Sequence, residues 1–231
     1  MNLATVLRFV ELEGKQHEDW ENRWYIIEDY VTMAKEMGIN FTAVLHAADI
    51  ETLCANCDGL ILPGSAMNIN PKYYGGEDQP PQRDEYDLDM RLIDYFVRSN
   101  KPIFGICGGF QELNIYFGGT IKRHGHDDIH AGGNFHPICV EKDSFVWDVY
   151  RQERAEVNSY HYWQLDKIAP PLQVVAVSDD GIPEAVQCND RNIFAVQWHP
   201  DRSFHDPRTA PVEKQFFANF ISTCRAVKHN P

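Results

Sequence analysis

The sequence predicts one α/β domain, residues 1–231, with a mostly parallel central sheet and helices on both of its faces. Short apolar runs alternate along the chain with segments whose apolar residues recur at helical spacing, as in strand–helix–strand units. A chain of 231 residues, 43% of them hydrophobic, is long enough to bury one sizeable core and is unlike disordered or fibrous chains. No repeat, low-complexity tract or linker divides it.

The alternation is clearest in the first half, and the second half is richer in strands. In the first half, the expected strands are residues 3–10, 39–45, 58–62 and 102–106, and the expected helices are residues 24–37, 88–97 and 108–117. In the second half, the expected strands are residues 136–140, 173–177, 184–188 and 193–197, followed by a closing helix around residues 216–221.

Composition excludes several functional classes. A formal net charge of −13 would repel phosphate backbones and anionic membranes, so nucleic acid is not an expected partner. No apolar run approaches the ~18 residues of a membrane helix, and the first ten residues have the pattern of a strand rather than of a signal peptide. The six cysteines show no disulfide framework, so we expect reduced thiols and a cytoplasmic protein.

The sharpest local signal is Gly105-Ile-Cys107-Gly-Gly109, between an apolar strand and a helical segment. This is the pattern of a nucleophile elbow with cysteine in place of serine. The sharp turn would expose the Cys107 sulfur at a helix N-terminus, where the helix dipole favours the thiolate. The backbone N–H of Gly108 would stabilise an oxyanion. The alternative is a buried cysteine in a glycine-rich turn.

A cysteine nucleophile needs an imidazole, and the imidazole needs an orienting carboxylate. Val196-Gln-Trp-His199-Pro-Asp201 follows another apolar strand, so His199 is expected at a strand end, where open α/β sheets place their sites. Asp201 is the candidate acid. A structural histidine in a His-Pro turn is the alternative for His199 taken alone.

Together the two elements resemble those of the class I glutamine amidotransferase-like superfamily, whose fold is flavodoxin-like. Within it the chain is most similar to the γ-glutamyl-γ-aminobutyrate hydrolase family, over residues 58–223. The segments that carry the resemblance are Gly59-Leu-Ile-Leu-Pro-Gly64, Asn70-Pro-Lys-Tyr-Tyr-Gly75, Gly105-Ile-Cys-Gly-Gly-Phe-Gln-Glu-Leu-Asn114, Gly118-Gly-Thr120, Val157-Asn-Ser-Tyr-His161, Asp180-Gly-Ile-Pro-Glu-Ala185 and Val196-Gln-Trp-His-Pro200.

The resemblance implies a Cys107–His199–acid triad that hydrolyses a γ-glutamyl amide through a thioester, with no metal ion or organic cofactor. It implies an oxyanion hole formed by the backbone N–H groups of Gly108 and Ser65. The substrate would be a small γ-glutamyl amine, such as a γ-glutamyl-γ-aminobutyrate-like or γ-glutamyl-polyamine-like compound. Relatives are commonly homodimers, so a homodimer is expected. The residues implied or expected to hold the substrate are Gly64, Gln111, Asn158, Ser159, Tyr160 and His161.

The chain departs from the family pattern in three places. Asp201 stands where the family usually has Glu, and Gly108 stands where it often has Arg. The turn after Leu62 reads Pro-Gly-Ser-Ala-Met-Asn, where the family usually has a second Gly and then an Asp. The last two changes fall near the pocket, so the substrate is expected to differ from the family's best-known one.

Two other groups have ligand-like residues. The sequence cluster His124, His126, Asp127, Asp128 and His130 is interpreted as a solvated loop at the pocket rather than a metal site, and Cys54-Ala-Asn-Cys57 lacks the second pair of a metal motif. Among functions, a free-standing γ-glutamyl amide hydrolase is favoured by Asn158-Ser-Tyr-His161. The alternatives are a glutaminase subunit that supplies ammonia to a synthetase partner, and a catalytically inactive binding module.

Overall fold

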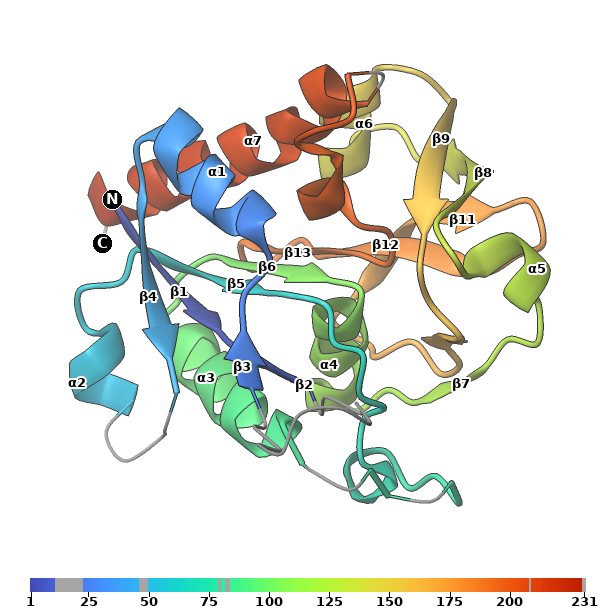
Figure 1. Cartoon of the computed structure of the whole chain (residues 1–231), viewed down its shortest axis with the longest axis horizontal. Helices are drawn as coiled ribbons and strands as arrows, with labels where there is room; N and C mark the ends of the chain where they lie inside the picture. Colours follow the sequence, from blue (N-terminus) through green and yellow to red (C-terminus); the bar gives the residue numbers. More distant parts are fainter. Residues whose placement is uncertain (11–22, 46–49, 79, 82–83, 208, 230–231) are drawn as a thin grey trace, which may run out of the picture.

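The computed structural model describes residues 1–10, 23–45, 50–78, 80–81, 84–207 and 209–229, and its centre is a nine-stranded mixed sheet (Figure 1). One end of the sheet, from β4 to β13, is parallel, and the other end, from β13 to β9, is antiparallel. The strands in order across the sheet are β4 (Asn40–Val44), β1 (Asn2–Val6), β5 (Gly59–Leu62), β6 (Ile103–Ile106), β13 (Ile193–Val196), β12 (Pro183–Cys188), β11 (Gln173–Ser178), β8 (Asn134–Val140) and β9 (Arg154–Ser159).

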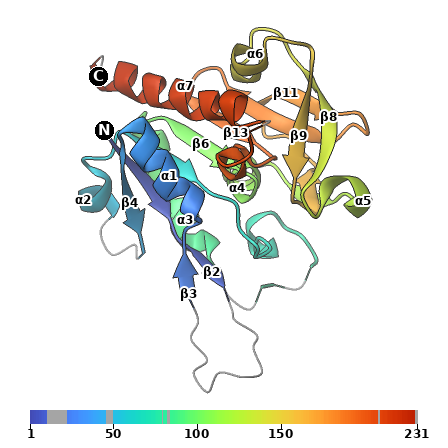
Figure 2. The same cartoon turned by 45° about the horizontal axis from the view of Figure 1, so that its top comes forward.

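Helices cover both faces of the parallel half, as the alternating sequence pattern predicts (Figures 1 and 2). The alternation of side chains along β5 shows how: Leu60 and Leu62 face one apolar core, and Ile61 faces the other. The first core is closed by α2 (Ile50–Cys54), α3 (Tyr86–Arg98) and α4 (Gly108–Tyr116), and the second by α1 (Glu28–Met37), α6 (Phe145–Tyr150) and α7 (Ala210–His229). The predicted α/β domain with a central sheet is therefore confirmed.

The N-terminal segment differs from its sequence prediction. The expected strand over residues 3–10 is broken at Leu7 into β1 and β2 (Arg8–Val10), and β2 pairs with β3 (Arg23–Tyr25) in a small separate sheet. The expected helix starts later than predicted, because Trp24 lies in β3 and α1 begins at Glu28. Its C-terminal signal is confirmed: Gly38 adopts the left-handed conformation, with φ 61°, that glycine accepts without strain.

The segment before residue 160 forms a strand that is not among those expected from the sequence. Asn158 and Ser159 lie in β9, paired antiparallel with β8. A short helix, α5 (Asp127–His130), and a two-stranded sheet of β7 (Ile121–Arg123) and β10 (Trp163–Leu165) lie beside this edge. Within the described ranges, no helix is both long and apolar enough to cross a membrane.

Candidate active site

The predicted elbow lies where β6 ends and α4 begins. Cys107 has φ 51° and ψ −98°, a strained conformation for a residue with a side chain. The flanking glycines permit it, because a Cβ on Gly105 would lie 2.7 Å from the carbonyl oxygen of Gly109, and one on Gly109 would lie 2.5 Å from that of Leu62. Close approach of α4 to the sheet therefore holds the cysteine in this strained position.

His199 follows β13, the neighbour of β6 in the sheet, and is buried. Its Nδ1 lies 3.0 Å from Oδ1 of Asp201, which is carried two residues on by the short helix η2 (Pro200–Ser203). The structure therefore brings together the predicted imidazole and carboxylate. Because a carboxylate oxygen accepts, Nδ1 donates, and Nε2 is left unprotonated in the neutral ring.

Asn158, on the edge strand β9, fixes the main chain of His199. Its side-chain Oδ1 accepts from the backbone N–H of His199 at 2.9 Å, and its Nδ2 donates to the His199 carbonyl oxygen at 2.9 Å. The sequence prediction was that main chain around Asn158 would add to the substrate pocket; its side-chain amide is committed to these bonds and to a further one to Ser203. Asn158 is therefore a positioning residue for His199.

Electrostatics favour a charged imidazole at His199. Burial by itself would lower the pKa of the ring, but the Asp201 carboxylate and the Cys107 sulfur outweigh burial and raise the pKa to about 9. At neutral pH His199 is thus expected to be an imidazolium beside the Cys107 sulfur.

Gly64 lies between Cys107 and His199. A Cβ added to Gly64 would be 2.6 Å from Cε1 and 3.2 Å from Nε2 of His199, and 3.2 Å from Cβ of Cys107. The two candidate catalytic side chains therefore converge on one point, and only glycine leaves room there for both.

The two predicted oxyanion donors are also adjacent. A Cβ on Gly108 would lie 3.2 Å from the backbone nitrogen of Ser65, so the main chains after Cys107 and after Gly64 run side by side. The Ser65 hydroxyl donates to Oε2 of Glu85 at 2.6 Å and accepts from the backbone N–H of Met67. These bonds fix the turn that carries the Ser65 nitrogen.

Arg8 also holds this turn, and sequence reasoning did not select it. Its guanidinium donates to the carbonyl oxygens of Pro63, at 2.6 Å, and Gly64, at 3.2 Å. It also forms ion pairs with the buried carboxylates of Asp89 and Glu112. Burial would lower the pKa of Arg8, but these two acids more than compensate and raise it above its ordinary value. The sequence signal that could have identified Arg8 is a positively charged residue within an otherwise apolar strand pattern.

A cavity of about 370 Å³ opens at this site, within the size range of small-molecule pockets. Of the residues predicted to contact substrate or oxyanion, the cavity is lined by Gly64, Ser65, Gln111, Tyr160 and His161. The Nε2 amide of Gln111 donates to the Trp163 carbonyl oxygen and to Gln197.

Ser159, by contrast, is fully buried behind the wall, where its hydroxyl donates to the carbonyl oxygen of His130. The Tyr160 ring lies nearly perpendicular to the His199 ring, with centroids 5.5 Å apart. The Arg202 guanidinium lies over the Tyr160 ring, 4.2 Å from its centroid. Tyr25, Tyr162 and Trp163 also line the cavity, so an aromatic wall borders the space near Cys107. Such a wall suits a substrate with an apolar linker.

The ligand-like sequence cluster of residues 124–130, interpreted from the sequence as a solvated loop, is not assembled as one site. His124 uses both ring nitrogens, accepting from the backbone N–H of His126 and bonding the His161 carbonyl oxygen, and His126 is half exposed. His130 instead faces three buried residues from other segments, His136, His161 and Glu184. Nothing in the sequence spacing indicated this second group.

The chain is similar in sequence to a known family and to named hydrolase and glutamine amidotransferase-like proteins. The family model described as Peptidase C26 matches residues 6–201. A γ-glutamyl-γ-aminobutyrate hydrolase from Escherichia coli O157:H7 is 31% identical over 201 residues, covering 79% of this chain and 78% of its own. A Lactococcus lactis protein named as glutamine amidotransferase-like is 27% identical, covering 88% of this chain and 90% of its own.

A solved structure supports the fold independently of sequence. The glutamine amidotransferase from Thermotoga maritima superposes with a TM-score of 0.68 over 96% of this chain and 97% of its own, at 12% sequence identity. At that identity the likeness concerns the fold alone.

Proposed function

The chain belongs to the Peptidase C26 family of glutamine amidotransferase-like hydrolases, and we propose that it hydrolyses the γ-glutamyl amide bond of a small γ-glutamyl amine, with Cys107 as the nucleophile. One observation carries this proposal. Cys107 stands at a strained strand–helix turn, and the Asp201-oriented ring of His199 converges with it on Gly64. This is the arrangement of an activated nucleophile, its base and the residue that orients the base.

In the proposed mechanism, the Cys107 thiolate attacks the γ-carbonyl carbon of the substrate. The oxyanion accepts hydrogen bonds from the backbone N–H groups of Gly108 and Ser65, each such donor contributing about 3–4 kcal/mol. His199 then gives its proton to the amine as the C–N bond breaks, which leaves a thioester on Cys107. A water molecule, deprotonated by His199, attacks the thioester carbon; the C–S bond breaks, glutamate is released, and the thiolate and the imidazolium are restored.

The aromatic wall supports an amine larger than ammonia as the leaving group. Tyr160, Tyr162 and Trp163 line the same cavity as Cys107. The E. coli relative carries the name of a hydrolase of this substrate class. Gly108 leaves this side of the elbow without the long side chain often present in the family, so we propose a leaving amine that differs from γ-aminobutyrate.

The test is a panel of γ-glutamyl amines, including γ-glutamyl-γ-aminobutyrate, γ-glutamyl-polyamines and free glutamine, with glutamate release as the readout. We expect at least one γ-glutamyl amine to exceed glutamine in kcat/KM. Comparable or higher kcat/KM for glutamine, or ammonia release only after a synthetase is added, would favour the glutaminase-subunit alternative.

Gly64→Ala is expected to lower kcat about 100-fold, the scale of loss from displacing a catalytic group by about 1 Å. The new methyl would lie 2.6 Å from His199, whose ring is held by Asp201 and whose main chain is held by Asn158. Circular dichroism and thermal unfolding would verify that the variant is folded. An active, folded Gly64→Ala enzyme would show that the two side chains do not meet at this point.

The pH dependence follows from the pKa of His199. Because the folded-state pKa is raised from 6.5 to about 9, the imidazolium persists at neutral pH and is lost as pH rises through about 9. We expect kcat/KM to fall along that alkaline limb. The stability due to this charge should be complete below pH 6.5 and disappear over the same rise. A kcat/KM profile that already falls near pH 6.5 would contradict the raised pKa of His199.

A further inference from the structure

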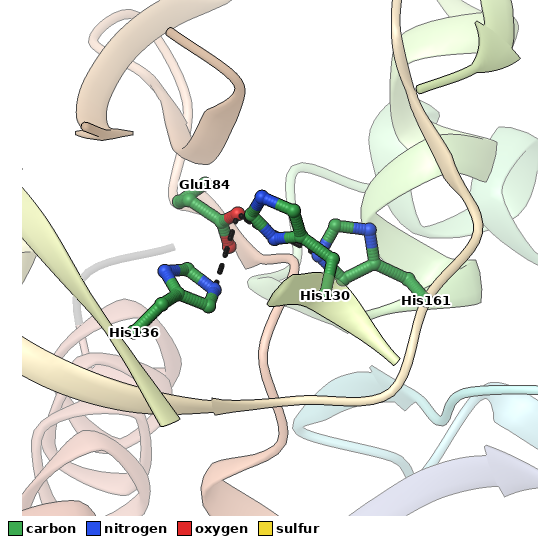
Figure 3. Close-up of side chains that lie close together, drawn as sticks. All are labelled: His130, His136, His161 and Glu184. Atoms are coloured by element: carbon green, nitrogen blue, oxygen red, sulfur yellow. Dashed lines mark ion pairs between the residues drawn. The ribbon is translucent and has the colours of Figure 1, made fainter. Parts of the chain in front are cut away.

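Four buried side chains from distant parts of the sequence converge beside the active-site wall. They are His130 at the end of α5, His136 on β8, His161 just after β9 and Glu184 on β12. One ligand atom from each lies within 4.8 Å of the others. Figure 3 shows the imidazoles of His130 and His136 beside the Glu184 carboxylate, with His161 next to His130.

The spacing is that of metal ligands rather than of hydrogen-bonded groups. Oε1 of Glu184 lies 3.5 Å from Nδ1 of His130, 3.6 Å from Nε2 of His136 and 3.5 Å from Nε2 of His161. Tetrahedral ligands at ~2.0–2.1 Å from a zinc ion are separated by about 3.4 Å. None of these three nitrogens, nor either oxygen of Glu184, has a hydrogen-bond partner among the described residues.

Hydrogen bonds on the outer side of each ring determine which nitrogen faces the cluster unprotonated. The other ring nitrogen of His130 lies 3.0 Å from a carboxylate oxygen of Asp180. That of His161 lies 3.0 Å from the Trp163 carbonyl oxygen, and that of His136 lies 3.3 Å from the Pro137 carbonyl oxygen. Those oxygens can only accept, so the outer nitrogens carry the protons and the inner ones present lone pairs. Metal-bound histidines are oriented in this way.

Burial keeps the rings in the form that binds metal. It lowers the pKa of all three, that of His161 to about 4, so they are neutral at physiological pH. Three lone pairs and a carboxylate that face one another without a partner are costly in a buried site. A cation at the centre would satisfy all of them.

We propose that His130, His136, His161 and Glu184 bind one divalent transition-metal ion, zinc in the first instance, at a structural site. Three imidazoles and one carboxylate are ligands that zinc accepts, and four protein ligands leave no open position for catalysis. The Cys107–His199 mechanism therefore remains metal-free, while the protein itself holds a metal ion, contrary to the expectation from sequence.

The ion would stiffen the wall of the cavity. The His130 carbonyl oxygen accepts from the Ser159 hydroxyl at 2.8 Å and from the His161 backbone N–H at 2.9 Å. The Trp163 carbonyl oxygen, which accepts from His161, also accepts from Gln111. The site would thus fasten α5 and β12 to the segment that carries Tyr160 and His161 past the active site.

Metal content of the purified full-length protein tests the proposal. Grown in zinc-supplemented medium and dialysed, the wild-type protein should contain about one zinc per chain by plasma mass spectrometry. The matched control, His126→Gln, alters a half-exposed histidine outside the cluster and should retain the ion. Asp180→Asn removes only the carboxylate behind His130 and should weaken zinc affinity about 10–100-fold.

Glu184→Gln separates a metal site from a shared-proton network. Burial raises the pKa of Glu184 to about 7, so a protonated carboxyl that donates to one imidazole is the competing explanation. An amide can also donate, so that network would survive Glu184→Gln with an unchanged melting temperature. At a metal site the variant loses zinc, and its melting temperature no longer rises with added zinc.

Reconstitution of the wild-type protein removes any dependence on how the variants fold. Protein stripped with a strong chelator should bind one Co²⁺ per chain and show the intense visible absorption of a tetrahedral cobalt centre. A wild-type protein with less than about 0.1 equivalent of any transition metal, and with no Co²⁺ spectrum, would overturn the proposal.

Discussion

Replacing Cys107 with alanine should reduce amide hydrolysis to the uncatalysed background, a loss on the order of 10⁶-fold if this system resembles a serine protease without its nucleophile. The strained elbow presents this sulfur to the cavity, and no other cysteine of the described residues lines that cavity. Without the sulfur no thioester can form, and water is a poor substitute for a thiolate. Glutamate release measured with the best substrate of the panel gives the result directly.

The control for this variant is Cys139→Ala. Cys139 is exposed, the other cysteines are buried, and its loss should leave hydrolysis unchanged. In the Cys139→Ala background, iodoacetamide should modify Cys107 first, and a glutamate-like ligand should protect it. Substantial hydrolysis by Cys107→Ala would refute the nucleophile assignment outright.

Asp201→Asn should preserve the fold and slow catalysis by less than the ~10⁴-fold loss of the comparable Ser-His-Asp change, because a thiol ionises more readily than a hydroxyl. The variant removes the anion that accepts from Nδ1 of His199 and raises the pKa of the ring. The alkaline limb of the kcat/KM profile should therefore move below pH 9. A purely structural role for Asp201 would lower activity without moving that limb.

Asp201→Glu tests whether the backbone is matched to the shorter side chain. The Asp201 carboxylate already lies at 3.0 Å from Nδ1, at the start of a short, buried helical turn. An added methylene would push the carboxylate into the ring or out of line with it, so we expect Glu to be less active than Asp. Wild-type rates in both Asp201 variants would require another acid beside His199.

The local part of the site could be predicted from sequence because each signal lay within a few residues. Glycines around Cys107 predict a strand–turn–helix elbow, and the structure contains it. The short spacing from His199 to Asp201 places the acid within reach of the ring, and the structure shows the 3.0 Å contact. The alternating apolar pattern likewise predicted the central sheet and its covering helices.

The non-local part could not be predicted, because it depends on how distant segments pair. Arg8 reaches the Pro63-Gly64 carbonyl groups only because β2 follows β1 past the turn. The Asn158 side chain acts on His199 because β9 brings its amide against the His199 main chain.

The histidine cluster is the clearest case of this limit. The ring nitrogens of His124 are both hydrogen-bonded, and His126 is half exposed, so neither sequence neighbour joins His130. The residues that lie beside His130 in space come from β8, β12 and the segment after β9. Sequence spacing identifies metal sites whose ligands share a helix or a turn, and this site is assembled by the antiparallel half of the sheet.

Peptide mass spectrometry of the acylated protein tests the central claim most directly. The wild-type protein is mixed with its best γ-glutamyl amine, quenched in acid within the first turnovers, and digested. The mechanism predicts a mass increase of one γ-glutamyl group on the peptide containing Cys107, which hydroxylamine removes as expected for a thioester. Rapid glutamate release with no such adduct, or an adduct on a peptide without Cys107, would contradict it.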